Sequence, residues 1–265
     1  MTYLKRFMAA FEGFSAAHGQ TQISNERRAG KQKAKSFIVR KPLTEELVEE
    51  HLKGSNGVGS IPINEENNCK FGALDIDQYP LDVVALDKKL RELKVPSVVC
   101  RSKSGGAHIF FFFKDYINAG EFRDKASEIS AVLGYGGCEI FPKQEQILVE
   151  RGDVGNFINL PYFDEKQTLR YAIKEDGEPA SLEEFLDLVD ARSVSPDGFV
   201  YFKKEDDRIA KVHYLEKRYQ DLEVHPFFKE GFYKSKLAEL APQYDFEVIE
   251  RATEKEKDSI RDIAA

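Results

Sequence analysis

Two carboxylates one residue apart, Asp75 and Asp77, close the apolar run that begins at Phe71. If this run is a β-strand, its side chains alternate with a period of two, so both acids point to the same face. Neighbouring like charges destabilise each other, and a hard cation such as Mg²⁺ or Mn²⁺ relieves the repulsion by oxygen ligation. The pair therefore indicates a divalent-cation site, with a solvated strand end as the simpler alternative.

A second segment with chemical potential is the loop over residues 101–107. Glycines let backbone amides approach a ligand, and hydroxyls and cations can bind phosphate oxygens; the loop supplies Gly105 and Gly106, Ser102 and Ser104, and Arg101 and Lys103. It runs into a strand and lacks a Gly-Lys-Ser or Gly-Lys-Thr, so it is not a P-loop. His108 follows the loop, where its imidazole can donate to a phosphate or serve only the fold.

A third acid, Glu139, lies between apolar strand-like residues. A buried carboxylate needs a positive neighbour. Either a metal shared with Asp75 and Asp77 or an ion pair with a nearby Lys or Arg would supply it. Lys143 can reach phosphates as a point charge.

Two amides further along the chain, Asn156 and Asn159, admit two interpretations. They can position the loop, a nucleotide or a template strand, or they can support the fold. Nothing in their spacing separates these alternatives.

The elements that must position these residues alternate between helices and strands. Helices are expected at 3–17, after Thr44, at 81–93, at 122–133 and after Ser181, where Glu184 completes a capping box. Strands are expected at 36–39, 57–63, 71–77, 97–100, 108–113, 137–141, 147–150, 156–160 and 169–173. The run at 108–113 is apolar on both faces and is expected to be a buried central strand.

Composition narrows the class of protein. The chain has 265 residues, 42% of them hydrophobic, and a net charge of −7, which argues against a surface coated with cations. Residues 27–41 nevertheless carry seven Lys and Arg and no acid, which indicates either a phosphate-attracting patch or an exposed basic loop. No apolar run is long enough to span a membrane, so we expect a cytoplasmic protein.

The three cysteines, Cys69, Cys100 and Cys138, lie far apart in the sequence. They form no Cys-x-x-Cys pair, so the sequence supports neither a zinc site nor a disulfide framework. We expect them to be buried free thiols.

Together these segments resemble the archaeo-eukaryotic primase superfamily. The resemblance rests on an acid-x-acid strand at Asp75 and Asp77, a small-x-His element at 106–108 and a hydrophobic-acid element at Glu139, in that order. More narrowly, the segments 102–108, 139–144 and 155–162 look like primase-polymerases of phages, mobile elements and CRISPR-associated operons, as do the stretches around His51 and 176–186. The resemblance covers about residues 40–190.

The resemblance implies an α+β catalytic core over residues 1–196, in which an N-terminal α/β unit packs on an RRM-like sheet. The active site is expected between these two parts, and residues 197–265 are expected to form a helical C-terminal extension.

It further implies a template-dependent nucleotidyltransferase, a DNA primase or DNA polymerase, that uses two divalent ions, Mg²⁺ or Mn²⁺. Asp75, Asp77 and Glu139 would be metal ligands. The triphosphate would be held by Arg101, Ser102, Ser104, Gly105, Gly106, His108 and Lys143. The implied partners are nucleoside triphosphates, single-stranded or primer-template DNA and a helicase on the same chain or in trans, with no membrane. For a phage- or plasmid-encoded protein, the compartment would be the host cytoplasm.

Two other functions fit the same residues. The acids could activate water in a metal-dependent nuclease, or the chain could be a non-catalytic nucleic-acid-binding replication module that uses the basic stretch 27–41. The third acid is a glutamate where the superfamily more commonly has an aspartate, and the zinc module that many primases use to initiate synthesis is missing. The triphosphate-binding residues favour polymerisation.

Overall fold

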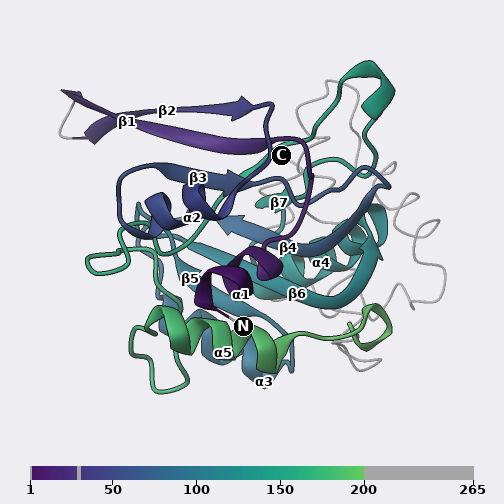
Figure 1. Ribbon diagram of the computed structural model, residues 1–265. Coiled ribbons are helices and arrows are strands. Elements are labelled where there is room, and N and C mark those ends of the chain that lie inside the picture. Colours follow the sequence, from purple (N-terminus) through teal and green to yellow (C-terminus); the bar gives the residue numbers. More distant parts are fainter. Residues whose placement is uncertain (1, 29–30, 200–265) are drawn as a thin grey trace, which may run out of the picture. The chain divides into compact units, whose positions relative to one another are not determined.

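The computed structural model describes residues 2–28 and 31–199. Its fold is mixed α+β, with two four-stranded antiparallel sheets (Figure 1). The chain forms two compact units, and the first, residues 1–126 and 138–201, contains both sheets. Of the second unit, only residues 127–137 are described. The sequence predicted a helical extension over residues 197–265. Its residues after Phe199 lie outside the described part of the chain.

The first sheet has the strand order β2-β1-β3-β8. It consists of β1 (His18–Arg28), β2 (Lys31–Val39), β3 (Gly57–Ser60) and β8 (Ile158–Asn159). β1 and β2 form a long hairpin (Figure 1), of which the sequence predicted only residues 36–39. Ile23 is the one strongly apolar residue of β1, so no apolar alternation marks this strand.

The second sheet carries the central elements of the candidate site. Its order is β5-β6-β4-β7, built from β4 (Asn68–Ile76), β5 (Val98–Arg101), β6 (Ala107–Asn118) and β7 (Glu139–Phe141). Helix α3 (Val83–Glu92) connects β4 to β5, and α4 (Ala119–Leu133) connects β6 to β7. This βαββαβ sequence is the predicted RRM-like unit, and β6 has a central position between β5 and β4, as expected.

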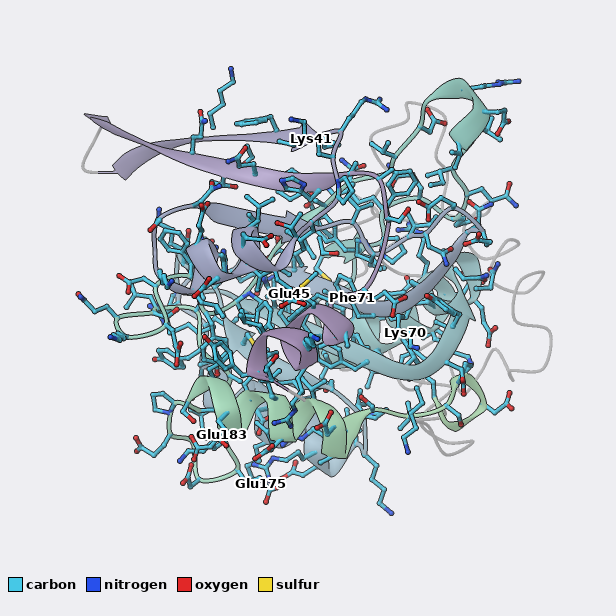
Figure 2. The ribbon with its side chains drawn as sticks, in the orientation of Figure 1. Lys41, Glu45, Lys70, Phe71, Glu175 and Glu183 are labelled. Atoms are coloured by element: carbon cyan, nitrogen blue, oxygen red, sulfur yellow. The ribbon has the colours of Figure 1, made fainter. Side chains whose placement is uncertain are left out.

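Aromatic side chains fill both faces of this second sheet. On one face Phe71, Phe110 and Phe112 surround Phe11, with ring centroids 5.2, 5.3 and 5.6 Å away. Figure 2 labels Phe71 in this interior. On the other face Phe111 and Phe113 contact Phe122 of α4. A strand covered on both sides reads as a continuous apolar run, which explains why β6 was predictable.

The remaining helices are α1 (Tyr3–Ala10), α2 (Glu45–Leu52) and α5 (Leu182–Arg192). The Thr44 hydroxyl caps α2, and Ser181 and Glu184 form the predicted capping box of α5. Helix α1 ends earlier than the predicted residue 17, because the Phe14 amide donates instead to the carbonyl of Ile61 at 2.9 Å. None of the helices in the described part of the chain has the length and apolar character needed to cross a membrane.

Two predicted strands were wrong. Residues 147–150 lead into a 3₁₀ turn, η1 (Val149–Arg151), and the segment 169–173 contributes only isolated bridges, Cys100 to Ala172 and Ile173 to Pro179. A short 3₁₀ turn, η2 (Pro196–Gly198), lies near the end of the described residues. Cys69 and Cys100 are buried free thiols as expected, and Cys138 is half-buried.

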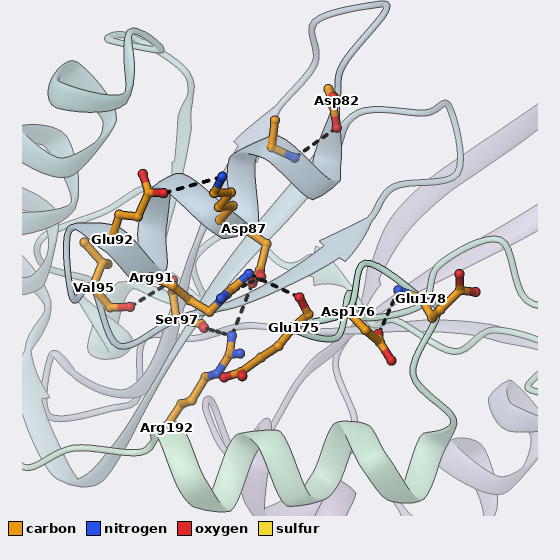
Figure 3. A network of polar contacts seen from close by, with 12 residues as sticks. Asp82, Asp87, Arg91, Glu92, Val95, Ser97, Glu175, Asp176, Glu178 and Arg192 are labelled. Carbon is orange, nitrogen blue, oxygen red and sulfur yellow. Dashed lines mark hydrogen bonds and ion pairs between the residues drawn. The ribbon is translucent and has the colours of Figure 1, made fainter.

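A buried acid connects α3 to α5 (Figure 3). Asp87, whose side chain is 1% exposed, pairs with Arg91 Nε at 2.8 Å and with Arg192 Nη1 at 3.3 Å. Arg192 also donates to the carbonyl of Ser97 at 2.8 Å, just before β5. The two arginines satisfy the carboxylate, so this network positions α5 against the start of β5.

Candidate active site

The register of the second sheet brings three predicted site residues into one row. β4 lies between β6 and β7, and Asp75 stands opposite His108 on one side and Glu139 on the other. In the neighbouring row Ala73 stands opposite Phe110 and Phe141. Side chains two residues apart on a strand share a face, so the polar row continues the apolar core face at the end of β4.

Asp75 and His108 form the innermost contact of the row. Their Oδ1 and Nε2 atoms are 3.3 Å apart, and the two side chains are only 18% and 14% exposed. The Asp75 Oδ1 atom is buried and has no hydrogen-bond partner among the described residues. A desolvated carboxylate oxygen needs a positive partner, which a protonated His108 or a bound cation would supply.

Asp77 lies immediately after β4 and is exposed. Its Oδ1 accepts a hydrogen bond of 2.7 Å from the hydroxyl of Tyr79. The bond to the Asp77 carboxylate is the main cause that raises the pKa of the Tyr79 phenol, and an interaction with Ser104 lowers it. Tyr79 therefore connects the end of the acidic strand to the 101–107 loop. Sequence reasoning missed it, because an exposed tyrosine in a loop carries no periodic signal.

The 101–107 loop is a tight turn pressed against the end of β4. The Ser102 amide donates to the Gly106 carbonyl at 2.8 Å, and the Gly105 amide donates to the Ser102 carbonyl at 3.1 Å. Gly105 has a φ of 96°, which glycine adopts without strain. A Cβ on Gly106 would lie 2.2 Å from the Ile76 carbonyl oxygen. The loop is thus fixed beside both acids.

The loop side chains differ in their surroundings. The Ser102 hydroxyl is buried and has no partner among the described residues, whereas Lys103 and Ser104 are exposed. Arg101 donates to the carbonyl of Leu169 at 3.1 Å. A buried hydroxyl without a partner is costly, so Ser102 joins Asp75 as a group that a ligand would satisfy.

Glu139 is exposed, contrary to the expectation that it is buried between apolar residues. Its side chain is 58% exposed, and Oε1 pairs with Lys143 Nζ at 2.7 Å. The Lys143 ammonium also lies 5.0 Å from the centre of the Phe141 ring. The ion-pair alternative is the arrangement that the structure contains, and Lys143 neutralises Glu139.

The oxygen donors of this site suit a hard cation in chemical type. Asp75 offers a buried oxygen without a partner, and Asp77 follows on the same strand. Within the described ranges, however, no group of three or more His, Cys, Asp or Glu side chains is arranged to hold a metal ion. Glu139 would have to leave Lys143 to join the two aspartates. The roles of these residues as metal ligands stay predictions.

The two asparagines serve contacts within the fold. The Asn159 Oδ1 atom accepts from the Thr21 hydroxyl at 2.8 Å, which ties β8 to β1. The Asn156 side-chain Oδ1 atom accepts from Gln144 Nε2, and the Asn156 backbone N–H donates to Gln144 Oε1 at 3.2 Å. The described contacts therefore correspond to their fold-supporting interpretation.

The buried histidine His51 also holds the fold together. Its Nδ1 accepts from the Val58 amide at 3.1 Å, and its Nε2 donates to the Pro161 carbonyl at 2.8 Å. Burial lowers the pKa of His51 to about 4. The neutral ring thus joins α2 to β3 and to the segment after β8.

The basic stretch 27–41 belongs to the β1–β2 hairpin and the residues after it. Arg40 donates to the carbonyl of Gly152 at 2.8 Å, and Lys35 and Lys41 are exposed. The side chains of the remaining basic residues, from 27 to 33, lie outside the described part of the chain. The expected phosphate patch stays a prediction.

A comparison with protein-family models identifies the family to which the chain belongs. Residues 2–187 match a model of archaeo-eukaryotic primase domains, so the chain belongs to the archaeo-eukaryotic primases. The matching model is a particular one, the archaeo-eukaryotic primase domain of TOTE conflict systems. The resemblance seen in the sequence is confirmed. No curated protein matches the chain.

Two solved structures are similar to the chain at low identity. The archaeo-eukaryotic primase domain of the cyanophage S-2L primase-polymerase is 12% identical, with a TM-score of 0.37, and the match covers 71% of this chain and 96% of that one. The catalytic domain of primase Repb′, solved in complex with initiator DNA, is 14% identical, with a TM-score of 0.34 and coverages of 72% and 91%. No site assignment in this protein rests on them.

Proposed function

We propose that this protein is a template-dependent nucleotidyltransferase that extends or initiates a polynucleotide from nucleoside triphosphates. The observation that carries the proposal is the row His108–Asp75–Glu139 across three strands, with the 101–107 loop packed against the end of the middle strand. Acids and a glycine-containing phosphate loop on one sheet edge suit phosphoryl transfer, which depends on positioning and charge stabilisation.

In this proposal Asp75, Asp77 and Glu139 would hold two divalent ions, Mg²⁺ or Mn²⁺. Bound metal would activate a 3′ hydroxyl and neutralise charge on the transferred phosphate. The triphosphate would be held by His108, by the hydroxyls of Ser102 and Ser104, by the backbone of Gly105 and Gly106, and by Arg101 and Lys143.

The Glu139–Lys143 ion pair gives Lys143 a second role. In the free protein Lys143 and Glu139 neutralise each other. If Glu139 served as a metal ligand, the Lys143 ammonium would lose this partner and could bind a phosphate oxygen as a point charge. The same exchange would couple nucleotide binding to completion of the metal site.

Incorporation of labelled nucleotides tests the proposal. Wild-type protein is incubated with a primed single-stranded DNA template, Mn²⁺ and labelled dNTPs or NTPs, and growth of the primer is expected with at least one of the two. Asp75→Asn and Asp77→Asn should abolish it. Asp124→Asn removes an exposed acid on α4 and should have no effect. Wild-type-like incorporation by either site variant would refute the assignment.

Two other functions are outcomes of the same assay. A nuclease would shorten the labelled strand. A non-catalytic DNA-binding module is favoured by the ion pair that already neutralises Glu139; it would bind DNA in EDTA and yield no product with any nucleotide. Dependence of synthesis on an added helicase would test the remaining predicted partner.

A further inference from the structure

Arg170 is a half-buried cation without an anionic partner. Its Nη1 atom lies 3.5 Å from the Leu160 carbonyl, and its guanidinium carbon lies 5.8 Å from the centre of the Phe163 ring. Within residues 2–28 and 31–199 no carboxylate forms an ion pair with it, and burial lowers the pKa of the guanidinium. A desolvated charge without a counter-ion is unfavourable, so this position suits an anionic ligand.

Strand pairing places Arg170 at the edge of the sheet that carries the candidate site. Ala172, two residues further on, forms a bridge with Cys100 of β5, and Cys100 pairs with His108. The Arg101 amide donates to the Tyr171 carbonyl at 2.9 Å. Residues 171–172 therefore continue the sheet beyond β5, and the row through Asp75 and His108 extends to Ala172, two residues after Arg170.

The guanidinium lies on the side of this sheet that faces the other one. Leu160, whose carbonyl it approaches, follows β8 and belongs to the same apolar core cluster as Cys100 and Ala172. Asp75 shares this face, because the core residue Ala73 precedes it by two positions. Arg170 and Asp75 therefore lie on the same face of this sheet.

The buried hydroxyl of Ser102 lies opposite Arg170 and has no described partner. Cys100 and Ala172 are antiparallel partners. Ser102, two residues after Cys100, therefore lies opposite Arg170, two residues before Ala172. The Ser102 residue is 6% exposed and its hydroxyl has no partner among the described side chains. A cation that lacks an anionic partner and a buried hydroxyl that lacks any described partner are the groups that an anionic oxygen would satisfy.

We propose that Arg170 and Ser102 form a phosphate-binding subsite at the β5 edge of the candidate active site. The proposal rests on the proposed function, because it assigns the subsite a phosphate group of the incoming nucleotide or of the polynucleotide. Phe163 lies beside the guanidinium and limits its orientation, and the planar fork of an arginine suits two oxygens of one phosphate. Neutral His51 nearby adds no competing charge.

Binding measurements that do not need turnover test the subsite. The variants are Arg170→Gln, Arg170→Lys and Lys88→Gln, which removes an exposed cation on α3 as a matched control. Equilibrium binding is measured with fluorescent single-stranded DNA in EDTA at two salt concentrations, and separately with a labelled nucleoside triphosphate in Mn²⁺. Thermal melting accompanies each variant.

The expected result is a loss of about tenfold or more in one of the two affinities for Arg170→Gln, partial recovery in Arg170→Lys, and no change in Lys88→Gln. Loss for the nucleotide alone identifies its phosphates. Loss for DNA alone, with a salt slope reduced by about one, identifies a backbone phosphate. Unchanged affinities for both, or losses that follow a lowered melting temperature in all Arg170 variants, would overturn the subsite. Absence of any synthesis by wild type would overturn the proposed function and leave these binding results valid.

Discussion

Gly106 sits directly on the backbone of the acidic strand, so that a Cβ at this position would lie 2.2 Å from the carbonyl oxygen of Ile76. Ile76 is the residue between Asp75 and Asp77. This backbone contact therefore holds the 101–107 loop and the two acids at a fixed separation. No side chain could be inserted there unless the loop moved.

Gly106→Ala is expected to reduce nucleotide incorporation by roughly a hundredfold, because a displacement of about 1 Å between reacting groups has this order of effect. Gly106 is buried, so urea denaturation is measured beside activity to separate displacement of the loop from loss of stability. Gly134→Ala is the control. Gly134 has a φ of 86°, and a Cβ there would contact no other atom, so this variant introduces backbone strain without a clash. Full activity in Gly106→Ala would show that the loop does not position the substrate.

Tyr79→Phe removes the hydroxyl that joins Asp77 to Ser104. We expect kcat/KM to fall about tenfold, since a hydrogen bond to a charged group is worth about 1.5–3 kcal/mol. The concentration of Mn²⁺ needed for half-maximal rate should also change, because Asp77 loses its fixed orientation. The Tyr79 side chain is 53% exposed, and the melting temperature should stay as in wild type. Unchanged kinetics would mean that the contact has no part in the reaction.

Asp87→Ala should strongly destabilise the fold. It leaves the guanidinium groups of Arg91 and Arg192 without their shared carboxylate, and loss of one partner from a buried pair costs about 3–5 kcal/mol. Urea denaturation followed by circular dichroism measures the change. Asp190→Ala, which removes an exposed partner of Arg6, should cost less than about 1 kcal/mol. Equal effects from the two variants would contradict the structural role of the Asp87 network.

His51 predicts how stability depends on pH. Its pKa in the folded protein is about 4, below the usual 6.5, so the unfolded chain binds more protons between these values. Stability is then fully present above about pH 6.5 and is lost as the pH falls toward 4, by about 3 kcal/mol. His51→Gln should be less stable at pH 7 but lose less on acidification. The comparison requires urea curves at several pH values, and parallel curves for the two proteins would contradict the assignment.

The second sheet was largely predictable because its strands have a strong chemical signature. The run at 108–113 is apolar on both faces, and the helices between the strands have caps and periodic apolar residues. The first sheet was not predictable in the same way. β1 is polar in sequence, and its pairing with β2 is specified by the hairpin instead of by apolar alternation.

Some features of the candidate site could likewise be predicted from the sequence, and others could not. The acid-x-acid strand and the glycine-containing loop are local patterns, so they could be found in the sequence. That Asp75 stands opposite both His108 and Glu139 depends on strand register, which no local pattern contains. Tyr79 and Arg170 gain their significance only from what lies around them, and the pairing of exposed Glu139 with Lys143 is likewise visible only in the structure.

The row through Asp75 also determines when the candidate site forms during folding. Its three members come from segments far apart in the chain, and a shift of one residue in the pairing of β6 or β7 would turn His108 or Glu139 to the opposite face. The site is therefore absent from every partly paired form of the sheet and arises only with the slow, long-range closure of both neighbours onto β4. If the proposed synthesis is observed, its rate will report completed folding more strictly than helix content does.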